Sequence, residues 1–327
     1  MKLRLLIILF FQLMCCQLIH SQPIAVRDSL LTLRLFHAIR TGSVDSVNLQ
    51  LTSGANPNGV MNNYSPLMAA ALNGTYEQMK ILLDHGANPN YCNADSISAI
   101  WLAIPDAAKT TLLLQHGANV QQRSREGNTL LVKLAAIPGS VALLQTLIKA
   151  GCDLRNTGRA NNALYNAAAC GDTALLGMFI RAGVPVNDTN CFGDYPINAS
   201  LNYRSFATLK MLVDNGADVN PVQTNGILPL VSGVTPLMWA AVSNDKKSFY
   251  YLLEHGARAK AKSPGGYTTL MFLAQSEADD PEMAKALLDH GVDPTVKALD
   301  ETDALFHFKK RGNTASIALL EKYIHQK

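Results

Sequence analysis

A short phrase built around one glycine recurs along this chain of 327 residues. It first reads LLDHGANPN, and its clearest copies span 82–90, 113–120, 212–220, 252–260 and 287–294. With looser copies included, the glycines of this phrase are Gly54, Gly86, Gly117, Gly151, Gly183, Gly216, Gly256 and Gly291. Successive members lie 31–35 residues apart, except for a step of 40 between Gly216 and Gly256. Such a period predicts an array of stacked supersecondary units.

The residues around each glycine predict the structure of one unit. Most of these glycines follow a helical run, and glycine ends a helix readily because positive φ costs it little. About twenty residues earlier, openings such as SPLMAAA from Ser65 and TPLMWAA from Thr235 place a hydroxyl cap and a proline at a helix start. The unit is therefore a turn, a short Ala-rich helix, a tight turn and a second helix. The chain is predicted to be an all-α repeat solenoid of helix-turn-helix units joined by β-hairpin-like turns.

These units resemble ankyrin repeats, whose pattern pairs a Thr-Pro-Leu-His-x-Ala opening with a Leu-Leu…Gly-Ala-Asp close. The resemblance covers about Leu35 to the C-terminus and is best over 64–90 and 234–260. The His of the pattern is replaced by Met68, Trp101, Tyr165, Asn198, Met238 or Met271. Because the resemblance implies that this His hydrogen-bonds neighbouring turns, we expect packing to replace polar bonding between repeats.

The first 21 residues predict an export signal. A basic start, MKLR, precedes the largely apolar stretch LLIILFFQLM, which is typical of a secretory signal peptide. The stretch is too short for a permanent span, which needs about 20 apolar residues. We expect cleavage after Ser21 and delivery to a bacterial periplasm or to the outside of the cell. Lipid attachment at Cys15 or Cys16 stays open as an alternative, although the small residue that such signals favour before the acceptor is missing.

The remaining residues, 22–327, predict a single ankyrin-repeat solenoid of about eight to nine units. The ends, at about 28–58 and 302–327, match the pattern weakly, as expected for terminal repeats that present one face to water. An apolar content of 48% with 16% charged residues supplies a continuous core. No membrane span is expected after removal of the signal.

Charge and motifs exclude several classes of function. The net charge is +3, and it falls to about +1 without Lys2 and Arg4 of the signal, whereas nucleic-acid binding needs clustered cations. No phosphate-binding loop, CxxC pair or nucleophile elbow occurs. We therefore predict no catalytic residues, no cofactor and no nucleic-acid partner.

Histidines and cysteines also lack the arrangement of a metal site. Four histidines share the repeat position before the glycine, where they favour the helix dipole and lie too far apart to share an ion: His85, His116, His255 and His290. Four cysteines remain after the signal, and we expect free thiols, with a Cys152–Cys191 disulfide as the open alternative: Cys92, Cys152, Cys170 and Cys191. No metal is predicted.

The candidate binding site is the surface of the short first helices, which lines the concave side of stacked repeats. The residue after the His position should point into this groove, which gives the row Ala69, Leu102, Val132, Asn166, Ala199, Trp239, Phe272 and His307. Trp239 and Phe272, on adjacent repeats, are the expected anchors, since aromatics carry much of the energy of interfaces. The alternative is that each packs as core.

The long step before Gly256 predicts an inserted loop at Pro221–Gly233. Insertions in repeat arrays often emerge on the binding face. This one is unusually apolar, and its partner-binding candidates are Ile227, Leu228 and Leu230. Folding back on the adjacent repeat is the alternative.

The sequence therefore predicts an exported, non-catalytic module that binds another protein through its concave groove and turn tips. The first alternative is a structural or accessory protein permanently associated with an exported enzyme or envelope component. A remote alternative is an enzyme, which would require the Pro221–Gly233 loop to enclose a pocket with convergent polar groups.

Overall fold

The computed structural model describes residues 24–155, 162–222 and 233–326. The helices fall into two compact units: unit 1 runs to Arg125 and includes Lys149–Cys152, and unit 2 comprises Glu126–Ile148 and the chain from Asp153 onward. Unit 1 contains α2 (Ile24–Thr41), α3 (Val44–Thr52), α4 (Pro66–Asn73), α5 (Tyr76–Asp84), α6 (Ala99–Ala103) and α7 (Ala107–Gln115). The single solenoid over 22–327 stays a prediction.

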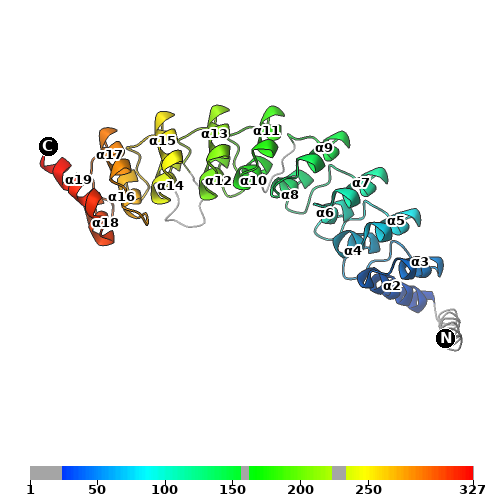
Figure 1. The fold of residues 1–327 in the computed structure, drawn as a ribbon. Helices are drawn as coiled ribbons and strands as arrows, with labels where there is room; N and C mark the ends of the chain where they lie inside the picture. Colours follow the sequence, from blue (N-terminus) through cyan, green and yellow to red (C-terminus); the bar gives the residue numbers. More distant parts are fainter. Residues whose placement is uncertain (1–23, 156–161, 223–232, 327) are drawn as a thin grey trace, which may run out of the picture. The chain divides into compact units, whose positions relative to one another are not determined.

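Unit 2 repeats the same helix pair six times (Figure 1). Its first helices are α8 (Leu130–Ala135), α10 (Ala163–Ala169), α12 (Pro196–Asn202), α14 (Pro236–Val242), α16 (Thr269–Ala274) and α18 (Ala304–Arg311). Its second helices are α9 (Val141–Lys149), α11 (Thr173–Arg181), α13 (Phe206–Asp214), α15 (Lys246–Glu254), α17 (Pro281–Asp289) and α19 (Thr314–His325). First helices pack on first helices and second helices on second helices, which makes two layers within each unit. The predicted all-α repeat architecture is confirmed.

The helices begin and end where the sequence predicts. The hydroxyls of Ser65 and Thr235 accept hydrogen bonds from the backbone N–H of Met68 and Met238, with proline at the first turn in both cases. Gly86 and Gly256 have φ of 83° and 88°, so each ends its second helix in the left-handed region. The turns between repeats contain isolated bridges, such as Met61 with Tyr64, and no strand occurs among the described residues.

The four histidines of the repeat phrase hold the ends of the second helices. In each, Nδ1 lies 2.7–2.9 Å from the carbonyl oxygen four residues earlier: His85, His116, His255 and His290. Because the carbonyl only accepts, Nδ1 carries the proton in this bond. Each of these carbonyls also accepts the backbone N–H of the same histidine, so the ring adds a second hydrogen bond at the end of the helix.

The position of the pattern His is mostly filled by packing, as expected. Met68, Met238 and Met271 are fully buried there. Asn198 occupies the same position in α12 and is also buried, yet neither atom of its side-chain amide has a hydrogen-bond partner among the described residues. An unsatisfied buried amide is costly, so Asn198 is an unfavourable residue in an otherwise apolar row.

Polar bonding between repeats nevertheless persists at a position that the sequence analysis did not single out. Asn90, four residues after Gly86, donates from Nδ2 to the Gly117 carbonyl at 2.9 Å and accepts from the Asn119 N–H at 2.7 Å. The same pair of hydrogen bonds is made by Asn58, Asn187 and Asn220, and Gln121 makes only the donated bond of the pair. Packing thus replaces polar bonding at the His position only. We call this series the amide ladder.

Candidate protein-binding surface

The predicted row in unit 2 lies along neighbouring first helices. Its members Val132, Asn166, Ala199, Trp239, Phe272 and His307 come from α8, α10, α12, α14, α16 and α18, which contact one another in that order. Val132 and Ala199 are buried, whereas the other four are half-buried. The partly exposed members of the row are therefore Asn166, Trp239, Phe272 and His307.

Trp239 and Phe272 are brought together by the packing of α14 on α16. Trp239 is only partly buried, and it packs against the core of the C-terminal repeats. Its indole N–H has no acceptor among the described residues. The ring of Phe272 meets Tyr267 edge to face, with centroids 6.4 Å apart. Trp239 thus combines core contact with a partly exposed ring, and Phe272 is half-buried beside Tyr267.

A hydrogen-bonded chain of side chains borders these aromatics. Tyr267 Oη donates to Asp300 Oδ2 at 2.5 Å, and Thr302 Oγ1 donates to Asp300 Oδ1 at 2.6 Å. His307 Nε2 lies 2.8 Å from Thr302 Oγ1. Because the Thr302 hydroxyl proton is given to the carboxylate, the ring nitrogen is the donor in this last bond. We call Tyr267, Asp300 and Thr302 the rim network, and Trp239, Phe272 and His307 the aromatic row.

The rim network fixes the charge of this surface. The hydroxyls of Thr302 and Tyr267 hold the pKa of Asp300 at about 2, so the carboxylate is ionised at neutral pH. The hydrogen bond to Asp300 raises the pKa of Tyr267. Burial lowers the pKa of His307, which favours a neutral ring. The row is therefore a patch of uncharged rings with the Asp300 carboxylate at its edge, and Asp303 and Lys310 are the other charged groups that act on His307.

The remaining predicted residues do not join this patch. Asn166 donates from Nδ2 to the Val132 carbonyl at 2.9 Å, so its amide links α10 to α8. Leu102 is half-buried in α6 of unit 1. Ile227, Leu228 and Leu230 lie outside the described residues. Sequence reasoning missed the rim network because Tyr267 and Asp300 are a full repeat apart; the Tyr before the Thr268 cap was its only local signal.

Chemistry-bearing groups are otherwise dispersed. Among the described ranges, no three His, Cys, Asp or Glu side chains gather closely enough to hold a metal ion. Cys92, Cys152, Cys170 and Cys191 are free thiols. None of the described helices has the length and apolarity that a bilayer crossing requires.

Comparison with known families identifies the repeats. A family model described as "Ankyrin repeats (3 copies)" matches residues 35–124, 164–263 and 198–298, which together cover more than half of the chain. In a solved structure, the human ASB11 ankyrin repeat domain aligns with a TM-score of 0.57 at 24% identity, covering 71% of this chain and all of that one. This likeness shows the fold.

Curated relatives differ widely in what surrounds their repeats. The ankyrin repeat and KH domain-containing protein mask-1 of Caenorhabditis elegans is 26% identical over 80% of this chain, which spans 11% of that protein. The human transient receptor potential cation channel subfamily A member 1 is 26% identical over 49% of the chain, or 15% of the channel. An L-asparaginase of Dirofilaria immitis is 25% identical over 50% of the chain, or 28% of that protein. The chain therefore spans only a small part of these relatives.

Proposed function

Because this chain belongs to the ankyrin repeat family, whose repeats generally serve as non-catalytic protein-interaction modules, we propose that it binds another protein and has no catalytic activity of its own. The aromatic row with its rim network is the proposed contact surface. The observation that carries the proposal is the pair Trp239 and Phe272, half-buried on adjacent first helices. Half-buried aromatic anchors combine a preorganised position with apolar area still available for burial.

The chemistry of the surface favours a particular kind of contact. Trp239 and Phe272 offer ring faces, and the Trp239 indole offers a donor. The Asp300 carboxylate, ionised at neutral pH, offers an acceptor for a cationic side chain. A partner segment with one large apolar residue near a lysine or arginine covers the rings and pairs with the carboxylate, and a backbone carbonyl of the same segment accepts from the indole N–H.

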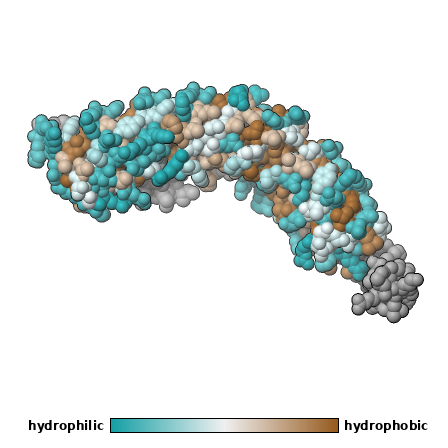
Figure 2. All heavy atoms as spheres, viewed as in Figure 1, coloured by the Kyte–Doolittle hydropathy of each residue, from teal (hydrophilic) through white to brown (hydrophobic). Residues whose placement is uncertain are grey.

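The distribution of hydropathy favours a reversible complex over a permanent one. A permanent partner requires a large continuous apolar face. In Figure 2 the visible face instead shows separate hydrophobic patches set among hydrophilic residues. The visible face therefore gives no support to the alternative of a structural accessory protein. The enzyme alternative depended on the loop at Pro221–Gly233, most of which lies outside the described residues.

Affinity capture followed by direct binding tests this proposal. The chain from Gln22 is immobilised, and proteins retained from its native fraction are identified and purified. Trp239→Ala/Phe272→Ala is expected to weaken binding of the retained partner by at least about 2 kcal/mol, which is about a 30-fold increase in Kd. The matched control is Phe192→Ala/Tyr203→Ala, which removes two exposed aromatics of unit 2 outside the row. Equal affinity of the double variant and the wild type would refute the proposed surface.

We also propose that the protein is exported, to a periplasm or out of the cell. The proposal is supported by the sequence of residues 1–21 alone, which lie outside the described residues. Mass spectrometry of the protein from cell fractions tests it. A mature N-terminus at Gln22 in the exported fraction is expected; a lipid on Cys15 or Cys16 would support the lipoprotein alternative, and an intact Met1 in the cytoplasm would overturn export.

A further inference from the structure

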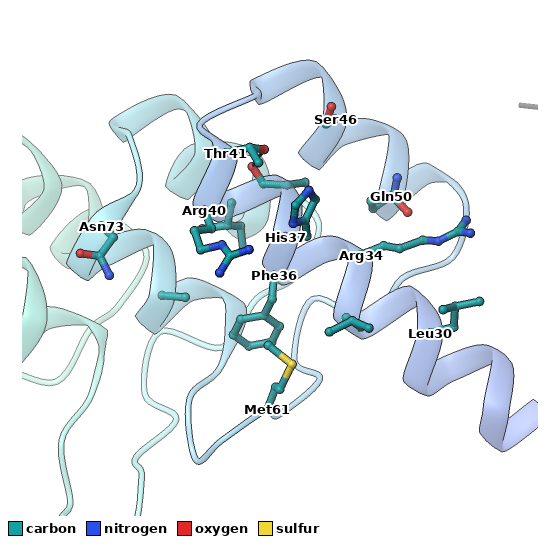
Figure 3. A pocket seen from close by; sticks show the side chains of 14 residues that line it. Leu30, Arg34, Phe36, His37, Arg40, Thr41, Ser46, Gln50, Met61 and Asn73 are labelled. Carbon is teal, nitrogen blue, oxygen red and sulfur yellow. Dashed lines mark hydrogen bonds between the residues drawn. The ribbon is translucent and has the colours of Figure 1, made fainter. Parts of the chain in front are cut away.

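A second surface with binding character lies in unit 1, apart from the proposed row in unit 2. A groove of about 770 Å³ runs along α2 and is bordered by α3, α4 and the turn before α4 (Figure 3). Its apolar lining includes Leu30, Leu33, Phe36 and Met61. Leu33 is 54% exposed, so the lining includes apolar surface that the fold leaves open.

The sequence of α2 explains the groove. Leu31, Leu35 and Ile39, spaced four residues apart, form a stripe buried in unit 1. Leu30, Leu33, Arg34 and His37 form a second stripe at helical spacing, and all four line the groove. The first stripe belongs to the core, whereas the leucines of the second stripe keep exposed surface: Leu33 is exposed and Leu30 is half-buried.

The charges of the groove are of one sign. Arg34, His37 and Arg40 line it, no acidic residue does, and neither arginine has an ion pair among the described residues. Figure 3 shows these three basic side chains projecting from the same helix. In α18 and α19, by contrast, Lys309 pairs with Glu321 at 2.8 Å. Arg34 and Arg40 therefore lie without an ion pair from the described residues beside exposed apolar surface.

We propose that this groove binds an acidic amphipathic helix of a partner protein. A helix fits because α2 and α3 already receive a helix pair, α4 and α5, on the side that forms the core of unit 1. Leucine-like side chains on one face of the incoming helix cover Leu30, Leu33 and Phe36. Its flanking carboxylates reach Arg34 and Arg40, since arginine pairs with carboxylates in a bidentate manner. This site does not depend on the function proposed for unit 2.

Designed peptides test the site directly with the full chain. The first probe is a fluorescein-labelled helical peptide of about 18 residues with leucines at i, i+3, i+4 and i+7 and glutamates beside them. The second peptide replaces every glutamate by lysine. Fluorescence anisotropy should show the glutamate peptide binding at least about tenfold tighter than the lysine peptide. Leu33→Ser should lower the affinity for the glutamate peptide by about tenfold.

Charge-reversal variants distinguish binding at this groove from a general attraction of the peptide to the charge of the whole protein. Arg34→Glu/Arg40→Glu is expected to invert the preference, so that the lysine peptide binds tighter; a misfolded variant would bind neither and would lose its helical circular dichroism. The matched control is Lys247→Glu/Lys285→Glu, which reverses two exposed lysines of unit 2 and should leave both affinities unchanged.

Four results would overturn the inference. In the first two, the wild type binds neither peptide, or binds both with the same affinity. In the third, the control reversal changes the peptide affinities as much as Arg34→Glu/Arg40→Glu does. In the fourth, Arg34→Glu/Arg40→Glu does not bind the lysine peptide more tightly than the wild type does. Binding to vesicles of anionic phosphatidylglycerol without peptide binding would assign the groove to a lipid surface instead, and concentration-dependent self-association by light scattering that Leu33→Ser abolishes would assign it to a second copy of the chain.

Discussion

Replacing Asn198 by methionine should stabilise the protein. Asn198 lies in α12, between α10 and α14, and is 2% exposed. Neither its amide nitrogen nor its amide oxygen has a partner among the described residues. In three other repeats the equivalent residue is a fully buried methionine, which shows that this position accepts that side chain: Met68, Met238 and Met271. The substitution Asn198→Met therefore follows the internal consensus of the array.

The expected gain can be worked from the burial of Asn198. An unsatisfied buried polar group costs about 1–3 kcal/mol, and methionine removes that cost. The longer side chain adds apolar burial worth about 0.8 kcal/mol per methylene group. Its extra volume costs about 1–3 kcal/mol where the neighbours must move. Because the last two effects oppose each other, we expect Asn198→Met to raise the free energy of unfolding by about 1–3 kcal/mol.

Thermal and urea unfolding measure this effect. A gain of 1 kcal/mol corresponds to about 2–4 °C in Tm for a unit of about 200 residues. Two further variants separate the causes. Asn198→Ala removes the amide without adding volume, and the reverse change Met238→Asn should destabilise by about 2–5 kcal/mol, since it buries an amide and leaves a cavity. A loss of stability in both Asn198 variants, or no loss in Met238→Asn, would show that the position satisfies a polar side chain, and the reasoning would be wrong.

Two further predictions concern the turns. Asn90→Ala removes both hydrogen bonds of one ladder step and should destabilise unit 1 by about 1–2 kcal/mol in urea unfolding. Asn90→Asp keeps the acceptor and should lower the free energy of unfolding by less. An alanine variant as stable as the wild type would contradict the role of the ladder. Asp300 is ionised in the fold with a pKa of about 2, so its contribution to stability is present above about pH 4 and is lost as pH falls toward 2. Tyr267→Phe removes one hydroxyl donor, so a carboxyl NMR titration should show the pKa of Asp300 rising; an unmoved titration would refute the assigned bond.

The fold was largely predictable because its determinants are local. A Ser or Thr cap before proline and a glycine at positive φ act within a few residues of each helix end. Ser65 and Gly86 therefore define a unit whether or not the neighbouring unit is known. The His85 bond to its helix carbonyl is equally local. Repetition of the same short signals made the period, and hence the architecture, readable.

The site was less predictable because its partners are a repeat apart. The row position correctly grouped Trp239 with Phe272 on adjacent helices, since it depends on register alone. It did not show that the side-chain amide of Asn166 donates a hydrogen bond to the Val132 carbonyl, because that bond depends on the spacing of α8 and α10. The groove on α2 was missed for a different reason. A leucine such as Leu33 is an ordinary helix residue in sequence, and only the packing shows which stripe the core uses.

The end of the amide ladder clarifies which residues can test function. Its position, four residues after the glycine, holds Lys260 and Thr295 in the last two steps, and the side-chain hydroxyl of Thr295 donates to Asp293 of its own turn instead. There, the bond from Tyr267 to Asp300 joins the neighbouring turns. The rim network therefore holds repeats together besides bordering the proposed contact surface. A change at Tyr267 would weaken both the array and the contact, so a loss of binding would not distinguish them. Trp239 and Phe272 make no such turn-to-turn bond, but Trp239 packs on the core and Phe272 contacts Tyr267, so their double substitution tests the binding surface when urea unfolding shows that the variant keeps its fold.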